Sequence, residues 1–233
     1  MRLRLQSSSP LQLAHLAPAF AMTVTASHGT IVVRRDGFAR VLTAGMGCTV
    51  EAFQPVTLLV AGSLAQPAAC SVALHATREM DEGCEGYEGY DRRAALHQRL
   101  SRRIFLQPQQ PWSAAHTASL LGDTPARVRR TLFAEGAALG ELCRTQRLMR
   151  LLFEAPHGHL PLTTLKHAIG WPASHDLESA FHDRFGTALH RFQCSASADA
   201  TRLLLPPATP SAPSVRRVAA PRPHHYWPSL FAA

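Results

Sequence analysis

The stretch that decides the fold begins with WSAAHTASLLGDTPARVRRTLFAEG, from Trp112 to Gly136. It predicts a short helix over Ser113–Leu121, a break at Gly122-Asp123 and a second helix over Thr124–Glu135. Thr124 is a favourable N-cap, and a proline at the first helical position suits a helix start. A tight helix pair joined by a glycine-containing turn is the usual way in which a protein places a helix in a DNA major groove.

The same pattern recurs downstream. A short helix is predicted over Leu162–Ile169, a break over Gly170–Pro172 and a further helix over Ser174–Phe185. A long amphipathic helix over Leu139–Glu154 links the two copies and would span about 24 Å. With the widths of the flanking helices added, the two recognition helices would lie near the ~34 Å repeat of successive major grooves.

The charge distribution favours a polyanionic partner. Residues 92–193 hold 14 Arg and Lys against 7 Asp and Glu, whereas residues 1–91 hold 6 against 8 and residues 194–233 hold 4 against 1. The net charge of +8 therefore lies in the tandem-helix region and the tail. Such a basic concentration is typical of a nucleic-acid-binding surface.

From Arg92 to Gln193 the sequence resembles the DNA-binding domain of AraC/XylS-type bacterial transcription regulators. The most specific matches are Trp112-Ser113, Thr124-Pro125 through Glu135-Gly136, Gly170-Trp171, Phe181 and Arg184-Phe185-Gly186. The resemblance implies a cytoplasmic regulator, usually an activator, that contacts double-stranded DNA and RNA polymerase. The second copy departs from the family at Lys166, Ser179 and Leu189, where a small residue, an Arg and a Pro are usual. The long stem of Lys166 is expected to reach out to solvent or to loosen the second helix pair.

In the first copy, Val128 and Leu132 supply the apolar stripe that a helix needs for its core. The remaining face carries four candidate DNA contacts, and the resemblance assigns base contacts to the first, third and fourth of them: Ala126, Arg127, Arg129 and Arg130. Arginine can contact guanine edges and phosphates alike. A solvated face or a phosphate contact remains the alternative for each arginine.

In the second copy the equivalent candidate DNA contacts are Ser174, His175, Glu178 and Ser179. Glu178 can accept a hydrogen bond from a cytosine amino group, but its charge repels phosphates. This composition favours a helix that lies in the DNA groove and positions the protein without reading the base sequence.

The N-terminal part predicts a small antiparallel β region, a partial cupin-like fold. Short β-branched runs separated by Gly and Pro indicate four or five strands, over Thr30–Val33, Ala39–Thr43, Val56–Val60 and Ser71–Leu74. So few strands are expected to pack against the helices or to mediate dimerisation rather than to enclose an effector. The fold class is therefore α+β, with a β region followed by an all-α tandem helix-turn-helix domain.

Five segments are expected. They are a disordered start (1–25), the β region with a dimerisation or vestigial sensor role (26–80), an acidic linker (81–91), the DNA-binding domain (92–193) and a disordered Pro- and Ala-rich basic tail (194–233). Met1 and Met22 are both plausible starts. No apolar run approaches the roughly 20 residues that span a bilayer, so no membrane partner is expected.

The pattern indicates no enzyme. No nucleophile triad, paired carboxylates or phosphate-binding loop is apparent, and the five unpatterned cysteines favour a reducing compartment over a disulfide framework. No catalytic residue, metal or cofactor is expected. The alternative to a regulator is an interaction protein with a degenerate helix-turn-helix domain, which acts through a protein partner; a homodimer or a regulatory protein partner remains open.

Overall fold

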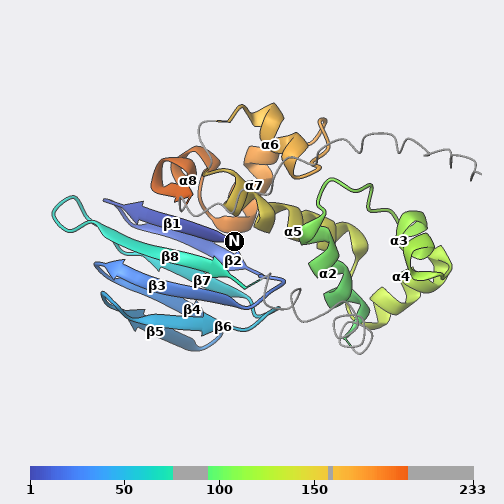
Figure 1. Cartoon of the computed structure of the whole chain (residues 1–233), viewed down its shortest axis with the longest axis horizontal. Helices are drawn as coiled ribbons and strands as arrows, with labels where there is room; N and C mark the ends of the chain where they lie inside the picture. Colours follow the sequence, from blue (N-terminus) through green and yellow to red (C-terminus); the bar gives the residue numbers. More distant parts are fainter. Residues whose placement is uncertain (76–93, 157–159, 199–233) are drawn as a thin grey trace, which may run out of the picture. The chain divides into compact units, whose positions relative to one another are not determined.

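The strands form two antiparallel sheets, visible in Figure 1. The computed structural model describes residues 1–75, 94–156 and 160–198. One sheet has the order β6-β3-β8-β1-β9 and the other has the order β2-β7-β4-β5. The strands are β1 (Arg2–Ser7), β2 (Leu11–Leu16), β3 (Met22–His28), β4 (Ile31–Arg35), β5 (Phe38–Leu42), β6 (Gly47–Val50), β7 (Val56–Val60), β8 (Ala68–Leu74) and β9 (Ala196–Ala198).

Each sheet buries one face because apolar residues alternate along its strands. In β1, Leu3 and Leu5 are buried while their neighbours Arg2 and Arg4 are exposed. The same period of two gives the buried rows of β3, β4 and β7. The inner faces meet in one hydrophobic core. The predicted strands at β4, β5, β7 and β8 are confirmed.

The expected disordered start is wrong. Residues 1–25 contain β1, β2 and most of β3, and β1 lies inside its sheet, paired with β8 on one side and β9 on the other. Leu11, Leu13 and Leu16 of β2 are fully or almost fully buried. Prolines at positions 10 and 18 fall between strands, where they interrupt no ladder. The β region is consequently larger than the four or five strands predicted.

The helices follow the tandem pattern. They are α2 (Leu96–Leu106), α3 (Ala114–Leu121), α4 (Pro125–Ala134), α5 (Leu139–Glu154), α6 (Leu162–Ala168), α7 (Leu177–Phe185) and α8 (Leu189–Ser195). We call α3 with α4 the first helix pair, and α6 with α7 the second helix pair. The predicted linking helix is confirmed as α5, with the same bounds.

The two helix pairs have different cores. The first is built on a separate small cluster of Leu100, Ile104, Ala118, Val128, Leu132 and Cys143. The second shares the large core of the two sheets, to which it contributes Phe181 and Phe185. Helix α7 contacts β2, and α8 contacts β1 and β9. In Figure 1, α7 and α8 lie beside the strands while α3 and α4 lie away from them.

This packing does not follow the expected segment boundaries. Met1–Ala200 forms one compact unit, so the helical part is not separated from the β region at residue 92. The tail expected from residue 194 begins instead with the end of α8 and with β9, which pairs with β1. The expected acidic linker and the rest of the tail lie outside the described residues. None of the described helices is both long enough and apolar enough to cross a membrane.

Candidate nucleic-acid interface

Local side-chain caps fix the start of α4. Gly122 ends α3 with φ 64°, a left-handed conformation that glycine adopts without strain. The Thr124 hydroxyl then accepts a hydrogen bond from the Arg127 N–H at 3.3 Å, and Pro125 occupies the first turn. Asp123 Oδ1 accepts from the Thr124 N–H at 2.7 Å. The predicted N-cap is thus confirmed, and the N-terminal half of α4 is held rigidly.

The exposed face of α4 lies opposite its buried stripe. Val128 and Leu132 are 1% and 2% exposed, whereas the four candidate contacts Ala126, Arg127, Arg129 and Arg130 are all exposed. Arg127 pairs with Asp123 at 3.4 Å. Within the described residues, Arg129 and Arg130 have no hydrogen-bond or ion-pair partner, so both guanidinium groups are available to a ligand.

The far end of α4 is tied to the start of α2. Glu135 accepts hydrogen bonds from the backbone N–H groups of Leu96 and His97 at 2.9 and 2.8 Å, and it lies 2.9 Å from His97 Nδ1. Burial raises the pKa of the Glu135 carboxyl, but these hydrogen bonds outweigh it, so that pKa lies below its ordinary value. A carboxylate at the first turn of α2 also suits the helix dipole.

The second recognition helix starts later than predicted. Helix α7 begins at Leu177, and the Asp176 carboxylate caps it by accepting from the N–H groups of Glu178 and Ser179 at 2.9 and 3.3 Å. Ser174 and His175 consequently lie in the preceding turn and not on the helix, which corrects the expected start at Ser174. The helix starts after Asp176 and not at Ser174 because the Asp176 side chain accepts hydrogen bonds from two backbone N–H groups that have no partner within the helix.

Three carboxylates lie on α7 and its cap in the second helix pair. All four candidate contacts there, Ser174, His175, Glu178 and Ser179, are exposed. The Ser179 hydroxyl donates to Asp176 Oδ2 at 2.6 Å, and the hydroxyl and N–H of Ser179 hold the pKa of Asp176 below its ordinary value. Asp183 lies on the same helix, 3.8 Å from Arg144 of α5. The carboxylates of Asp176, Glu178 and Asp183 disfavour a phosphate there.

The turn of the second helix pair is packed rather than open. Gly170 has φ 63°, and a Cβ at this position would come within 2.3 Å of the Pro108 carbonyl oxygen. That carbonyl accepts from Arg147 Nε at 3.0 Å, and Gln109 Nε2 donates to the Ala168 carbonyl at 3.2 Å. Arg147 is therefore a structural residue that holds the segment after α2 against the second turn.

The side chain of Lys166 reaches across the turn of the second helix pair. Its Nζ donates to the Ala173 carbonyl oxygen at 3.0 Å, at an exposed position between α6 and α7. The long stem thus carries the amine outward to a surface carbonyl. The positive charge also faces Asp176, whose pKa it helps to lower.

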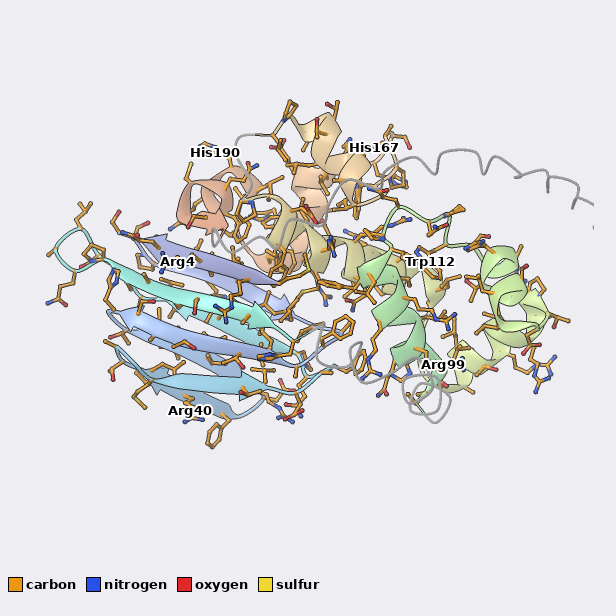
Figure 2. The ribbon with its side chains drawn as sticks, viewed as in Figure 1. Arg4, Arg40, Arg99, Trp112, His167 and His190 are labelled. Carbon is orange, nitrogen blue, oxygen red and sulfur yellow. The ribbon has the colours of Figure 1, made fainter. Side chains whose placement is uncertain are left out.

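A cleft of about 500 Å³ is lined by residues of α5 and of the second helix pair. His175 and Ser179 line it together with Arg144 of α5 and the two indoles of Trp112 and Trp171. Trp112, labelled in Figure 2, is fixed by a hydrogen bond from Nε1 to the Gln107 carbonyl at 2.9 Å. Two of the second pair's candidate contacts thus border a cleft, whereas those of α4 lie on an exposed helix face.

Comparison with solved structures identifies the fold. ToxT from Vibrio cholerae in its P21 crystal form aligns with a TM-score of 0.60 at 9% identity, over 84% of this chain and 98% of that one. ToxT from strain O395 gives 0.58 at 10% identity, over 84% and 97%. Wild-type ToxT with a bound unsaturated fatty acid gives 0.57 at 9% identity, over 84% and 95%.

The chain has the ToxT fold. The alignments cover both the β region and the helices, so the predicted α+β class and the resemblance to AraC/XylS-type regulators are confirmed at the level of the fold. No protein-family profile and no curated protein sequence matches the chain. Identities of 9–10% do not extend the likeness beyond the fold.

Sequence reasoning overlooked two features of this surface. Phe133, on α4, is 85% exposed and follows Arg129 and Arg130 by four and three residues. The sequence signal was the spacing: residues three and four apart share a helix face, so the apolar Phe133 falls on the face of the two arginines. The Asp176 cap was also missed, although an aspartate directly before a helix is a standard start signal.

Proposed function

We propose that this chain is a transcription regulator that binds double-stranded DNA in a sequence-specific manner, with α4 in a major groove. The observation that carries the proposal is the exposed face of α4, on which Arg129 and Arg130 have no partner among the described residues. This face lies directly opposite Val128 and Leu132, so the helix can dock without losing its core contacts. Ala126 is small enough to allow close approach to the bases, and Arg127 is placed to contact a phosphate or a base.

The second helix pair is proposed to position the protein on DNA more than to read sequence. Ser174, His175, Glu178 and Ser179 are accessible to a neighbouring groove, but Ser179 is already engaged with Asp176. Glu178 is suited to a cytosine amino group and is repelled by phosphates. The sequence discrimination is therefore assigned mainly to the first helix pair.

The activator role and contact with RNA polymerase follow from the resemblance and form part of the proposal. The proposal also includes a cytoplasmic location, and either a homodimer or a regulatory protein partner. The alternative, an interaction protein with a degenerate helix-turn-helix domain, is favoured by one observation. Helix α7 and its cap carry three carboxylates, and α7 packs against β2 of the sheets.

The test is DNA binding by the full chain at several salt concentrations. The full chain is needed because the second helix pair shares its core with the sheets. Binding should weaken steeply with salt, with log K falling by about 0.9 per phosphate neutralised. A double variant, Arg129→Ala with Arg130→Ala, should reduce both affinity and salt slope. Arg40→Ala, an exposed arginine on β5, is the matched control and should leave both unchanged.

Two results would contradict the proposal. Affinity that is flat between low and physiological salt would remove the phosphate contacts on which the proposal depends. Equal losses in the α4 double variant and in Arg40→Ala would show that general basicity, and not the α4 face, binds DNA.

A further inference from the structure

The most exposed aromatic side chain described on the helices is Phe133, at 85%. It lies near the C-terminal end of α4 and takes no part in the hydrophobic cluster of the first helix pair. Val128 and Leu132 already fill the buried side of α4. A single exposed apolar side chain is common on protein surfaces, so a binding role for Phe133 depends on the side chains that share its helix face.

The position of Phe133 on the helix ties it to the proposed DNA contacts. Residues 126, 129, 130 and 133 follow the spacing that places side chains on one helix face. Phe133 lies about 4.5 Å further along the axis than Arg130 and about 6 Å further than Arg129. Because base pairs rise about 3.4 Å along DNA, the ring would reach one or two base pairs beyond the arginine contacts.

We propose that Phe133 is a specificity-determining residue that contacts the C5-methyl group of a thymine in the major groove. The inference rests on the proposed function of α4 as the reading helix. Thymine is the base that presents a methyl group in that groove, and phenylalanine is among the side chains that contact it. The recognised sequence thus contains a thymine next to the base pairs that Arg129 and Arg130 contact.

The neighbours of Phe133 favour DNA over an apolar protein partner. An apolar protein surface covering the ring would also cover Arg129 and Arg130, which have no partner within the described chain. Burying those charges unpaired is costly, whereas guanine and phosphate groups offer acceptors to both. The occupant that satisfies all three side chains together is therefore the major groove of DNA.

The experiment uses the full chain and duplexes that the wild-type protein selects from a random pool. Each thymine of a selected duplex is replaced in turn by deoxyuridine, which lacks the methyl group, and affinities are compared. At one or two positions the wild type should bind about fourfold more weakly, the value for one lost methyl contact. Phe133→Ala should be insensitive at those positions, and Phe133→Leu should recover part of the response.

The matched control is Phe38→Ala, which removes a phenyl ring 73% exposed on β5. It should show the wild-type response to every deoxyuridine. Thermal melting of Phe133→Ala should match that of the wild type, because the ring contributes no core contact. A large loss of melting temperature would contradict the proposal by giving Phe133 a structural role.

Failure of the inference is distinguishable from failure of the proposed function. If the wild type selects no sequence, both fall. If it selects a sequence and needs Arg129 and Arg130, while Phe133→Ala keeps every deoxyuridine penalty, the inference falls alone. An equal loss on thymine and deoxyuridine duplexes would assign Phe133 to the sugar-phosphate backbone and would likewise overturn it.

Discussion

The first and second helix pairs share one sequence pattern but differ in what surrounds them. The first has its own small core and exposes three arginines on α4. The second buries the apolar face of α7 in the core of the sheets and exposes Asp176, Glu178 and Asp183. The same motif thus presents one helix with an exposed arginine face and one helix whose apolar face packs against the β region.

This difference separates two requirements of a DNA-binding regulator. A reading helix needs an accessible face with donors that have no competing partner, which α4 provides. A helix that anchors the protein must instead share contacts with the rest of the fold, as α8 does when Arg191 donates to Ser9 and Pro10.

The largest expected effect comes from the shared core. Phe181 is fully buried, with its ring centroid 4.8 Å from that of Phe185 and 5.5 Å from that of Phe192. Phe181→Ala should cost about 3–5 kcal/mol of stability and weaken hydrogen-exchange protection in β1 and β2 as well as in α7. Leu132→Ala should lower protection mainly in α2 to α4. Unchanged strand protection in Phe181→Ala would contradict a shared core.

The two turn glycines offer the next comparison. Gly122 and Gly170 have nearly the same positive φ, 64° and 63°, but a Cβ on Gly122 would meet nothing within 4 Å. Gly122→Ala should therefore cost only the backbone strain, about 1–2 kcal/mol. Gly170→Ala should cost clearly more, because its Cβ must displace the Pro108 backbone. Equal urea midpoints for the two variants would show that the second turn is not packed as described.

Sequence discrimination provides the third test. Each good bidentate arginine–guanine pair is worth about 1–3 kcal/mol of discrimination. Arg130→Ala should accordingly lose more discrimination than His175→Ala, whose side chain lies in a turn beside a cleft. The measurement is affinity for the selected duplex relative to single-base variants. A greater loss in His175→Ala would make the second helix pair the reader.

The smallest effect concerns the junction of α2 with α4 and its dependence on pH. The folded pKa of Glu135 lies below its unfolded value of about 4.3, so its contribution is present above that pH. The contribution is lost as pH falls through the folded pKa. Glu135→Gln should lower the free energy of unfolding by about 1 kcal/mol at pH 7. It should also reduce the loss of stability as the pH falls below the pKa of the folded carboxyl. If Glu135→Gln loses stability at acid pH as much as the wild type does, this carboxylate is not the cause of that loss.

Much of the helical part could be predicted from the sequence because its signals are local. The caps at Ser113 and Thr124, the glycine break and the periodicity of α5 are all set by residues within a few positions of one another. The exposed face of α4 followed from the same periodicity, since the two apolar positions fix which side is buried. Phe133 was within reach of that argument and was missed.

The tertiary structure decided what the second helix pair packs against. The apolar face of α7 predicts burial, but its partner β2 lies more than 150 residues earlier in a segment expected to be disordered. Leu11, Leu13 and Leu16 form a strand because β7 pairs with them and the core covers them. Such contacts depend on surfaces that meet only after folding, and no local pattern encodes them. The sequence by itself determined the helix pairs and their charge; the tertiary packing determined that one pair is free and the other anchored.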